Sequence, residues 1–445
     1  MRAAFAILLG LLAGHAPPAQ ATPRDALPAP LTERAYAAHP EGLVRLGWQL
    51  FYDPILSGNR EVACATCHHP AFGTSDGLSL GLGDGGIGLG PARVADPANP
   101  PEQRVARNSP ALWNLGAQEF TRLFHDGRIE ADPTRPSGLR TPLEEDMVTG
   151  FASVLSAQTM FPVLSPDEMA GHYSENEIAQ AVRQGRLTGP GGAWDLIAGR
   201  VRAIPEYAAQ FTSVMPEITE ADEIGFTHVS DAIAAFIAVE FRSDTSPFDA
   251  FLRGTGAVPP DALRGLDLFY GRAGCAGCHA GPFQTDHAFH ARGVPQLGPG
   301  KAARFESHRR DLGRMRVTGR AEDAYAFRTP SLRNVAQTAP YGHAGAHATL
   351  DAFIRDHADP VAALDRYDRA QVILPDLPFD DWQILDDPAE RAAIARAVRT
   401  PPIPLRADDI ADLVAFLNTL SDPEALAGRL GVPDAVPSGL PVPRP

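Results

Sequence analysis

The sequence is poor in cysteine, in positive charge and in long apolar runs. Only four cysteines occur in 445 residues, and all of them fall in two motifs. The formal net charge of −15 argues against a nucleic-acid-binding protein, because such proteins carry basic patches. After residue 21, no apolar stretch approaches the length needed to cross a bilayer, so the mature chain is expected to be soluble. Alternating strand patterns are also scarce, which favours a mainly α fold.

Residues 1–21 have the pattern of a secretory signal peptide. Arg2 supplies the charged start, an apolar run covers residues 3–14, and Ala19-Gln20-Ala21 offers a small-residue cleavage site. That run is too short to span a membrane. The mature protein is therefore expected to be exported, with an acidic surface that steers a basic redox partner or simply keeps the protein in solution.

The four cysteines form two copies of one motif. These are Cys64-Ala65-Thr66-Cys67-His68 and Cys275-Ala276-Gly277-Cys278-His279. Cys-x-x-Cys-His is the attachment signal for c-type haem: both thiols bond to the porphyrin and the histidine ligates the iron. A structural zinc site does not call for a histidine after each pair, and a thioredoxin-type pair normally occurs once, near a βαβ pattern. The sequence predicts two covalently bound c-type haems.

The surroundings of the two motifs repeat as well. Apolar residues at helical spacing precede the first motif within residues 43–51 and the second within residues 263–270. Each half closes with another amphipathic segment, residues 231–241 and 407–420. This layout predicts a mainly α protein with two cytochrome c-like haem domains in tandem, long loops and little strand.

The expected organisation has four parts. They are a signal peptide (1–21), an N-terminal cytochrome c-like domain (22–253), a C-terminal cytochrome c-like domain (254–432) and a loose tail (433–445). Residues 254–260 form the expected linker. Residues 77–104 are rich in Gly, Pro and Asp and too long for a simple connection, so this loop is expected to be functional or mobile. Ser174 and Glu177 match a capping box that opens a helix.

Further segments resemble the bacterial di-haem cytochrome c peroxidase family, which includes the methylamine-utilisation di-haem enzymes. The resemblance covers about residues 40–422. It rests on Leu50-Phe51-Tyr52-Asp53, Leu56-Ser57-Gly58-Asn59, Arg107-Asn108-Ser109-Pro110, Asp126-Gly127-Arg128, Ser246-Pro247-Phe248-Asp249, and residues 329–341 with Thr329-Pro330-Ser331-Leu332-Arg333-Asn334 and Thr338-Ala339-Pro340-Tyr341. It implies a peroxidatic haem in the N-terminal domain and an electron-transfer haem in the C-terminal domain.

For the first haem, the resemblance implies His68 as proximal ligand and an open opposite face. Many family members close that face with a histidine at the position where this chain has Asp84. An aspartate is a poor substitute for an imidazole, so the iron is expected to bind peroxide without prior activation. The alternative is that His125 or His172 folds over to close the site.

The residues expected to act on peroxide are Glu168 and Gln158. The family supplies a glutamate as acid/base and a glutamine as hydrogen-bond donor, and this pair has the family spacing, with Pro162 between them matching a family proline. A positioned carboxylate can move a proton from one peroxide oxygen to the other. Taken alone, Glu168 would be read as a solvated residue at a helix start.

For the second haem, the resemblance implies His279 as proximal ligand and His357 as sixth ligand. The family register places a methionine there in typical peroxidases and a tyrosine in the methylamine-utilisation enzyme. Competing ligands are Met315, His347 and His343. Because methionine ligation raises haem potentials, two histidines should give a lower one.

Two further features concern the region between the haems. Family members commonly place a tryptophan where this chain has His125, so hole transfer would use Trp113, a phenylalanine or direct tunnelling instead. The family also holds a calcium ion at this interface. Asn108, Thr338 and Pro340 match its protein ligands, and such oxygen ligands suit Ca²⁺; otherwise Asn108 merely caps a turn.

These observations support three hypotheses about function. The first is a periplasmic haem-dependent peroxidase that reduces hydrogen peroxide with electrons from a small cytochrome c or cupredoxin. The second is an enzyme that uses peroxide to oxidise side chains of a partner protein. The third is a non-enzymatic electron carrier or peroxide sensor. The resemblance leaves a homodimer open.

Overall fold

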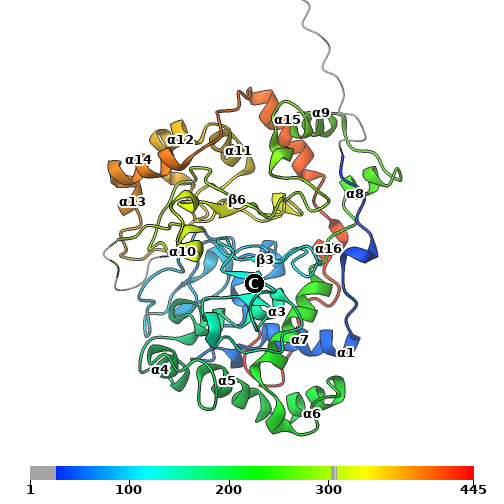
Figure 1. Cartoon of the computed structure of the whole chain (residues 1–445), viewed down its shortest axis with the longest axis vertical. Coiled ribbons are helices and arrows are strands. Elements are labelled where there is room, and N and C mark those ends of the chain that lie inside the picture. Colours follow the sequence, from blue (N-terminus) through cyan, green and yellow to red (C-terminus); the bar gives the residue numbers. More distant parts are fainter. Residues whose placement is uncertain (1–26, 302–305, 307) are drawn as a thin grey trace, which may run out of the picture.

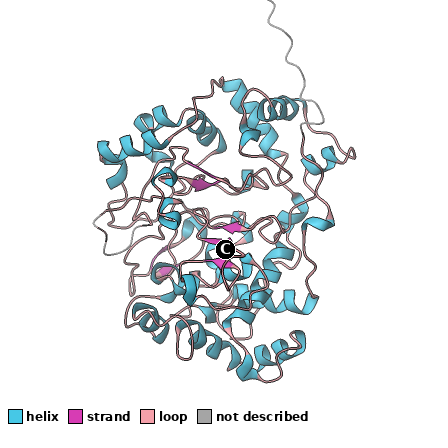
Figure 2. Ribbon diagram, in the orientation of Figure 1, coloured by secondary structure: helices cyan, strands magenta, loops and turns pink. Residues whose placement is uncertain are grey.

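The computed structural model describes residues 27–301, 306 and 308–445 (Figure 1). The expected signal peptide lies outside these residues. The described chain is mainly helical, with a few short strands near its centre (Figure 2). Within the described ranges, no helix combines the length and apolar character needed to cross a membrane.

The helices divide between two halves of the molecule. The lower half in Figure 1 holds α1, α3, α4, α5, α6 and α7, and the upper half holds α9 and α11 to α15. The bounds of the first eight helices are α1 (Glu41–Tyr52), α2 (Cys64–Cys67), α3 (Val154–Thr159), α4 (Glu177–Arg183), α5 (Ala193–Arg202), α6 (Pro205–Val214), α7 (Phe226–Glu240) and α8 (Pro247–Leu252). The others are α9 (Pro260–Tyr270), α10 (Met315–Thr318), α11 (Leu350–Ala358), α12 (Pro360–Arg366), α13 (Gln383–Asp386), α14 (Pro388–Ala397), α15 (Ala407–Asn418) and α16 (Pro423–Ala427).

The strands form three small antiparallel sheets. Their pairs are β1 (Gly86–Ile87) with β2 (Val94–Ala95), β3 (Arg122–Leu123) with β4 (Ile129–Ala131) and β4 with β5 (Leu139–Arg140), and β6 (Phe289–His290) with β7 (Phe327–Arg328). In the three-stranded sheet Leu123 pairs with Ile129, and in the last sheet Phe289 pairs with Arg328. The backbone N–H of Arg328 also donates to the carbonyl oxygen of His125 at 2.7 Å, which links the two halves.

Each half is built on the same helix pair, as the sequence repeat predicts. In the first half α1 packs against α7, and a Cβ atom added at Gly47 would lie 1.8 Å from the carbonyl oxygen of Ala232. In the second half α9 packs against α15, and a Cβ atom at Gly265 would lie 1.9 Å from the carbonyl oxygen of Asp412. Both glycines begin a Gly-x-x-Leu-Phe-Tyr run that leads to a haem motif. The tandem arrangement is therefore confirmed in its packing.

The expected domain boundaries are wrong in two places. Phe248 of α8 packs against Phe416 of α15, with ring centroids 5.3 Å apart, so α8 belongs to the second half rather than the first. The segment 433–445 is not a loose tail. Val436 is buried in the first core and Ser438 Oγ donates to Asp53 Oδ1 at 2.6 Å. The chain returns to the N-terminal half after α15 because its apolar residues, spaced between prolines, fit that core.

The long loop 77–104 is packed rather than open. Arg93 is 4% exposed and donates to three carbonyl oxygens of its own loop, those of Leu82, Gly83 and Gly88, each at 2.6 Å. Such a guanidinium fixes a loop because each buried carbonyl needs a donor.

The helix expected after Ser174 begins at Glu177, but the capping residue is Asn176. The side chain of Asn176 accepts from the N–H of Ala179. The Ser174 hydroxyl instead donates to the neighbouring Tyr173 carbonyl.

Candidate active site

The first haem motif forms the short helix α2 and ends at His68. Thr66 Oγ1 accepts from the N–H of Ala63 at 3.0 Å, which caps the helix. His68 Nδ1 donates to the carbonyl oxygen of Thr74 at 3.0 Å, leaving Nε2 as the metal-binding nitrogen. Metal-ligating histidines typically hold their second nitrogen in such a bond.

The second motif repeats this geometry. Cys275–Gly277 form a 3-10 turn, and His279 Nδ1 donates to the carbonyl oxygen of Gln284 at 3.1 Å, which again leaves Nε2 for a metal. Asp286 and His290 lie beside Cys278 and could complete a metal cluster with it. That thiol belongs to the haem motif, however, and His290 Nε2 bonds to Asp286 at 2.8 Å.

The four thiols fit covalent haem. Within the described chain none is in a disulfide. Burial raises the pKa of the Cys64 thiol to about 12 and that of Cys275 to about 11, so neither is a thiolate at neutral pH. A partly buried thiol pair next to an imidazole with a free nitrogen is the donor set that a c-type haem uses.

Gln158 and Glu168 lie in α3 and in a later turn of the same half. Gln158 is in α3 and is 9% exposed, and no described residue donates a hydrogen bond to its buried Oε1. Glu168 is in the turn Pro166–Ala170, which follows the turn Pro162–Leu164 and packs against it.

The negative charge of Glu168 affects the second cysteine of the first motif. Burial raises the pKa of the Cys67 thiol to about 12, and the negative charges of Asp76 and Glu168 add to that rise. The carboxylate of Glu168 therefore lies close enough to the first attachment site to act on it.

Asp84 is held away from any ligand role by its own neighbours. Its carboxylate is 1% exposed and accepts from Asn59 Nδ2 at 3.0 Å. Burial, with the nearby negative charge of Glu175, raises the pKa of Asp84 to about 6. A Cβ atom at Gly83 would lie 2.3 Å from the carbonyl oxygen of Glu168, so the Asp84 loop packs directly on the Glu168 turn.

The two histidines considered as alternative ligands of the first iron differ in their environment. His125 Nε2 donates to the carbonyl oxygen of Asn108 at 3.1 Å. In contrast, neither ring nitrogen of buried His172 has a hydrogen-bond partner within the described residues, and its Nδ1 lies 3.5 Å from Glu102 Oε2. His172 therefore remains the better placed competitor.

His357 lies in the last turn of α11, in the same buried site as His279. Its ring stacks on Phe353 with centroids 5.2 Å apart. Burial lowers the pKa of His357 well below its usual value, and the nearby Arg292 and His279 lower it further. The imidazole is therefore neutral at pH 7, as a metal ligand must be. Axial ligation by His357 stays a prediction.

The other candidates for this ligand differ in their contacts, and His343 Nε2 has no hydrogen-bond partner within the described residues. His347 Nε2 bonds to Asp356 Oδ2 at 2.9 Å. His343 stacks on Phe327, with ring centroids 3.7 Å apart. Met315 begins α10 and is half-buried. The hydrogen bond of His347 counts against that residue. The preference for His357 over His343 and Met315 rests on the resemblance of the sequence to the family.

A buried ion network joins the two halves between the motifs. Arg107 Nε donates to Asp311 Oδ2 at 2.6 Å, and Arg107 NH1 donates to Asp126 Oδ2 at 2.7 Å. The three side chains are at most 7% exposed. Burial lowers the pKa of neighbouring His125 to about 4, and the charge of Arg107 adds to this shift. The residue at the family tryptophan position is thus neutral at pH 7.

Asn108 belongs to the same interface. Its backbone N–H donates to the carbonyl oxygen of His343 at 2.9 Å, and its Nδ2 donates to the carbonyl oxygen of Leu78 at 2.8 Å. The amide nitrogen is used in this way, so Oδ1 is the atom that could bind a cation. Calcium binding by this atom with the carbonyl oxygens of Thr338 and Pro340 stays a prediction.

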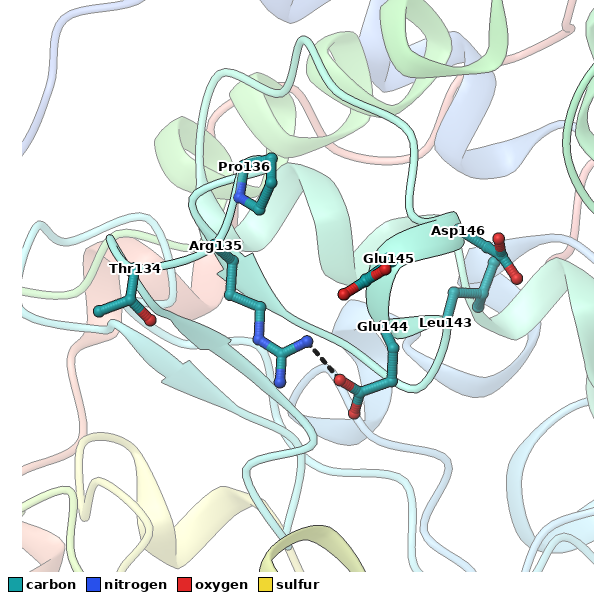
Figure 3. A pocket seen from close by; sticks show the side chains of 7 residues that line it. All are labelled: Thr134, Arg135, Pro136, Leu143, Glu144, Glu145 and Asp146. Atoms are coloured by element: carbon teal, nitrogen blue, oxygen red, sulfur yellow. Dashed lines mark hydrogen bonds and ion pairs between the residues drawn. The ribbon is translucent and has the colours of Figure 1, made fainter.

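A surface pocket of about 660 Å³ lies apart from these residues (Figure 3). It is lined by Thr134–Pro136, Leu143 and the acidic turn Glu144–Asp146, and Arg135 pairs with Glu144 across it. None of the candidate site residues lines this pocket.

Two arginines near the haem motifs were not expected from the sequence. Arg93 fixes the loop that carries Asp84, and Arg292 lies beside His357. Neither occurs in a motif, and a guanidinium that donates to backbone carbonyls leaves no pattern in sequence. Only the fold could reveal them.

Comparison with known proteins agrees with this arrangement of two haem-binding halves. A family model described as di-haem cytochrome c peroxidase matches residues 41–257. The chain is 30% identical over 387 residues to the methylamine utilization protein MauG of Methylorubrum extorquens, covering 86% of this chain and 79% of that protein. It is 29% identical to the cytochrome-c peroxidase IdrP2 of Pseudomonas sp. (strain SCT), covering 71% of this chain and 73% of that protein.

A solved structure is similar over nearly the whole fold. The crystal structure of a MauG-like protein associated with microbial copper homeostasis has a TM-score of 0.56 at 26% identity, covering 90% of this chain and 94% of that chain. The fold and the two attachment motifs define a tandem c-type haem protein. More particularly, the chain belongs to the di-haem cytochrome c peroxidase family, whose named members are haem-dependent oxidoreductases.

Proposed function

We propose that this protein is a periplasmic di-haem peroxidase that reduces hydrogen peroxide to water with electrons from a small redox protein. The observation that supports this most is Glu168, whose negative charge acts on the Cys67 thiol of the first attachment site and whose turn packs against the loop of Asp84. When bound, the first haem supplies the redox-active iron that passes electrons to peroxide.

Each residue of this chain has a defined task. Glu168 accepts the proton from one oxygen of hydrogen peroxide and returns it to the other oxygen, which then leaves as water. The Gln158 amide N–H groups donate to the peroxide oxygens and hold the molecule in place. Two electrons and two protons complete the conversion of one peroxide to two waters. Arg93 holds the loop that carries Asp84 in place.

The second haem, held by His279 and His357, would pass electrons to the first haem and would not bind peroxide itself. His125 is neutral at pH 7 because burial lowers its pKa to about 4, and an imidazole is hard to oxidise. Trp113, which is 3% exposed and 5.8 Å from Phe241 between ring centroids, is the aromatic alternative. Calcium at Asn108, Thr338 and Pro340 would stiffen the interface that this route crosses.

A second function is the oxidation of side chains in a partner protein. It is favoured by Asp84, which leaves the iron open at rest, and by the similarity to the methylamine utilization protein. His125 at the tryptophan position weighs against it. A test with candidate partner proteins and peroxide, read by mass spectrometry, would separate it from simple peroxide reduction.

The proposal can be tested on the purified holoprotein with peroxide and a reduced small cytochrome c. The variant Glu168→Gln is expected to lower kcat/KM by about 10²-fold or more, because a general acid–base is removed. The matched control Glu145→Gln, on the exposed acidic turn, should leave kcat/KM unchanged. Full activity in Glu168→Gln, or no turnover of the wild type with any one-electron donor, would contradict the proposal.

A further inference from the structure

A second hollow, of about 380 Å³, opens where the two halves of the molecule meet. Its first-half residues lie in or beside β3, β4 and β5, and its second-half residues lie in or beside α10. Figure 1 shows β3 and α10 close to the boundary between the halves. Four arginines line the hollow together with two carboxylates, and these are Arg122, Arg140, Arg314, Arg320, Glu130 and Asp132. This excess of positive charge is local, because the whole chain has a net charge of −15.

The carboxylates of the hollow do not match its arginines one to one. Arg314 NH2 donates to both oxygens of buried Glu130 at 2.9 Å. Arg140 NH2 donates to Asp132 Oδ2 at 3.3 Å. Arg122 Nε lies 3.5 Å from Oε2 of the same Glu130 that Arg314 already occupies. The positive charge of Arg122 therefore has no carboxylate of its own.

Donor groups on both sides of the hollow are unused within the described chain. The two terminal amino groups of Arg122 donate to no described residue, and its side chain is 47% exposed. The buried Nε of Arg140 has no aligned acceptor among the described residues, although Glu130 Oε1 lies 3.3 Å away. In the second half, Arg320 uses Nε and NH2 on Asp323, which does not line the hollow, and no described residue accepts from its NH1. An acceptor placed between the halves would therefore meet free guanidinium groups on both sides.

Arg314 gives this site a rigid base. Its side chain is 10% exposed, NH1 donates to the carbonyl oxygen of Gly127 at 2.9 Å, and the guanidinium lies 4.3 Å from the ring centre of Phe289. Because Gly127 and Glu130 belong to the first half and Arg314 to the second, this arginine holds both walls in place before a ligand binds. Such preorganisation lowers the entropic cost of binding.

We propose that the hollow binds a small multivalent oxyanion, a phosphate or a dicarboxylate, between Arg122 and Arg140 of the first half and Arg320 of the second. A guanidinium presents its N–H groups as a planar fork that matches the paired oxygens of carboxylates and phosphates. An acidic partner protein fits less well, because a net charge of −15 repels it over its whole surface. A small anion responds mainly to charges within a Debye length of about 8 Å. None of these arginines has a task in the proposed peroxide chemistry, so the inference goes beyond that function and does not depend on it.

Isothermal titration calorimetry of the holoprotein with inorganic phosphate and with malonate tests the site, at a fixed ionic strength of about 0.15 M so that charge screening stays constant. One saturable site is expected for a dianion, with acetate binding at least about tenfold more weakly because a monoanion cannot engage both halves. Arg122→Gln and Arg320→Gln should each weaken malonate binding about tenfold or more, since each removes charge-assisted hydrogen bonds. Malonate should also raise the Tm of the wild type but not that of the variant with both substitutions, because a ligand stabilises the folded state that binds it.

The matched control is Arg264→Gln, because Arg264 pairs with Asp412 and has the same 61% exposed side chain as Arg320. This variant should bind malonate like the wild type. The inference is overturned if neither phosphate nor malonate shows saturable binding, if acetate binds as tightly as the dianions, or if both arginine variants bind like the wild type. Tighter binding of a hexaglutamate peptide than of malonate would assign the hollow to a partner protein and would also overturn it.

Discussion

The two halves of this molecule use the same scaffold and differ on one face of each haem site. Gly47 and Gly265 let equivalent helices approach to backbone contact, and His68 and His279 are tethered through Nδ1 to a carbonyl oxygen a few residues on. The opposite faces have nothing in common. The Glu168 turn and the Asp84 loop that packs on it lie near the first motif, whereas the predicted ligand His357 lies near His279 of the second.

The difference shows how one fold supports two roles. Attachment and proximal ligation depend on a local motif, so duplication copies them intact. The other face depends on distant segments, which can change without disturbing the helix pair. Substitutions that give one half a feature of the other, or that disturb the helix pairs common to both halves, therefore test this comparison.

The largest effect is expected from opening the second site. His357→Gly should turn the low-spin signal of the second haem into a high-spin one, because the sixth ligand is removed and α11 has no substitute at that position. Electron paramagnetic resonance of the oxidised holoprotein would show the change, and added imidazole should reverse it. A retained low-spin signal would assign the ligand to another residue such as His347.

The second largest effect is expected from the buried ion pairs of Arg107, which join the two halves. Arg107→Ala should lower the free energy of unfolding by about 3 to 5 kcal/mol, because Asp126 and Asp311 are left buried and unpaired. Denaturant unfolding at pH 7 would measure it. The exposed pair of Arg45 with Glu41 gives the control, where Arg45→Ala should cost no more than about 0.5 kcal/mol.

The shared helix pairs should respond alike to one added methyl group. Gly47→Ala and Gly265→Ala should each destabilise their half by about 1 to 3 kcal/mol, because the new Cβ meets backbone that cannot move aside. Gly199→Ala in α5, where an added Cβ would meet only the end of the Arg202 side chain at 3.6 Å, should be neutral or slightly stabilising. Thermal unfolding monitored in each haem band would reveal whether the two costs differ.

The smallest effect is a pH dependence of the first half. The pKa of Asp84 is raised to about 6 against an ordinary value near 3.8, so the native state binds more protons than the unfolded state between these values. The contribution of Asp84 to the free energy of unfolding is therefore greatest below pH 4 and is lost as the pH rises through 6.

The substitution Asp84→Asn removes the carboxyl group whose ionisation lowers the free energy of unfolding. It should be more stable than wild type by about 1 to 3 kcal/mol at pH 7 and no different at pH 4. The exposed Asp146→Asn should change stability at neither pH. An equal gain at both pH values would show that the carboxylate is not buried as its contacts indicate.

The sequence foretold the features that depend on short motifs or on helical periodicity. The two haem sites, the helix before each motif and the closing helices all follow from patterns within a few turns of chain. The Gly-x-x-Leu-Phe-Tyr repeat even marks the glycine that each helix crossing requires.

The features that the sequence did not foretell depend on contacts between distant segments. Val436 and Ser438 lie among prolines without a periodic pattern, so their packing on the N-terminal half was not expected. Phe248 belongs to the second core because it packs against Phe416 of α15, which lies far along the chain. Asn176 and Ser174 are both good capping residues, and only the backbone decides between them.

The central claim is that the first iron is open at rest and the second is not. Titration of the oxidised holoprotein with cyanide, followed by electron paramagnetic resonance, tests it most directly. The account predicts that one high-spin and one low-spin signal are present at the start, and that one equivalent of cyanide converts only the high-spin signal. Two low-spin signals at rest, or no binding of cyanide, would contradict it.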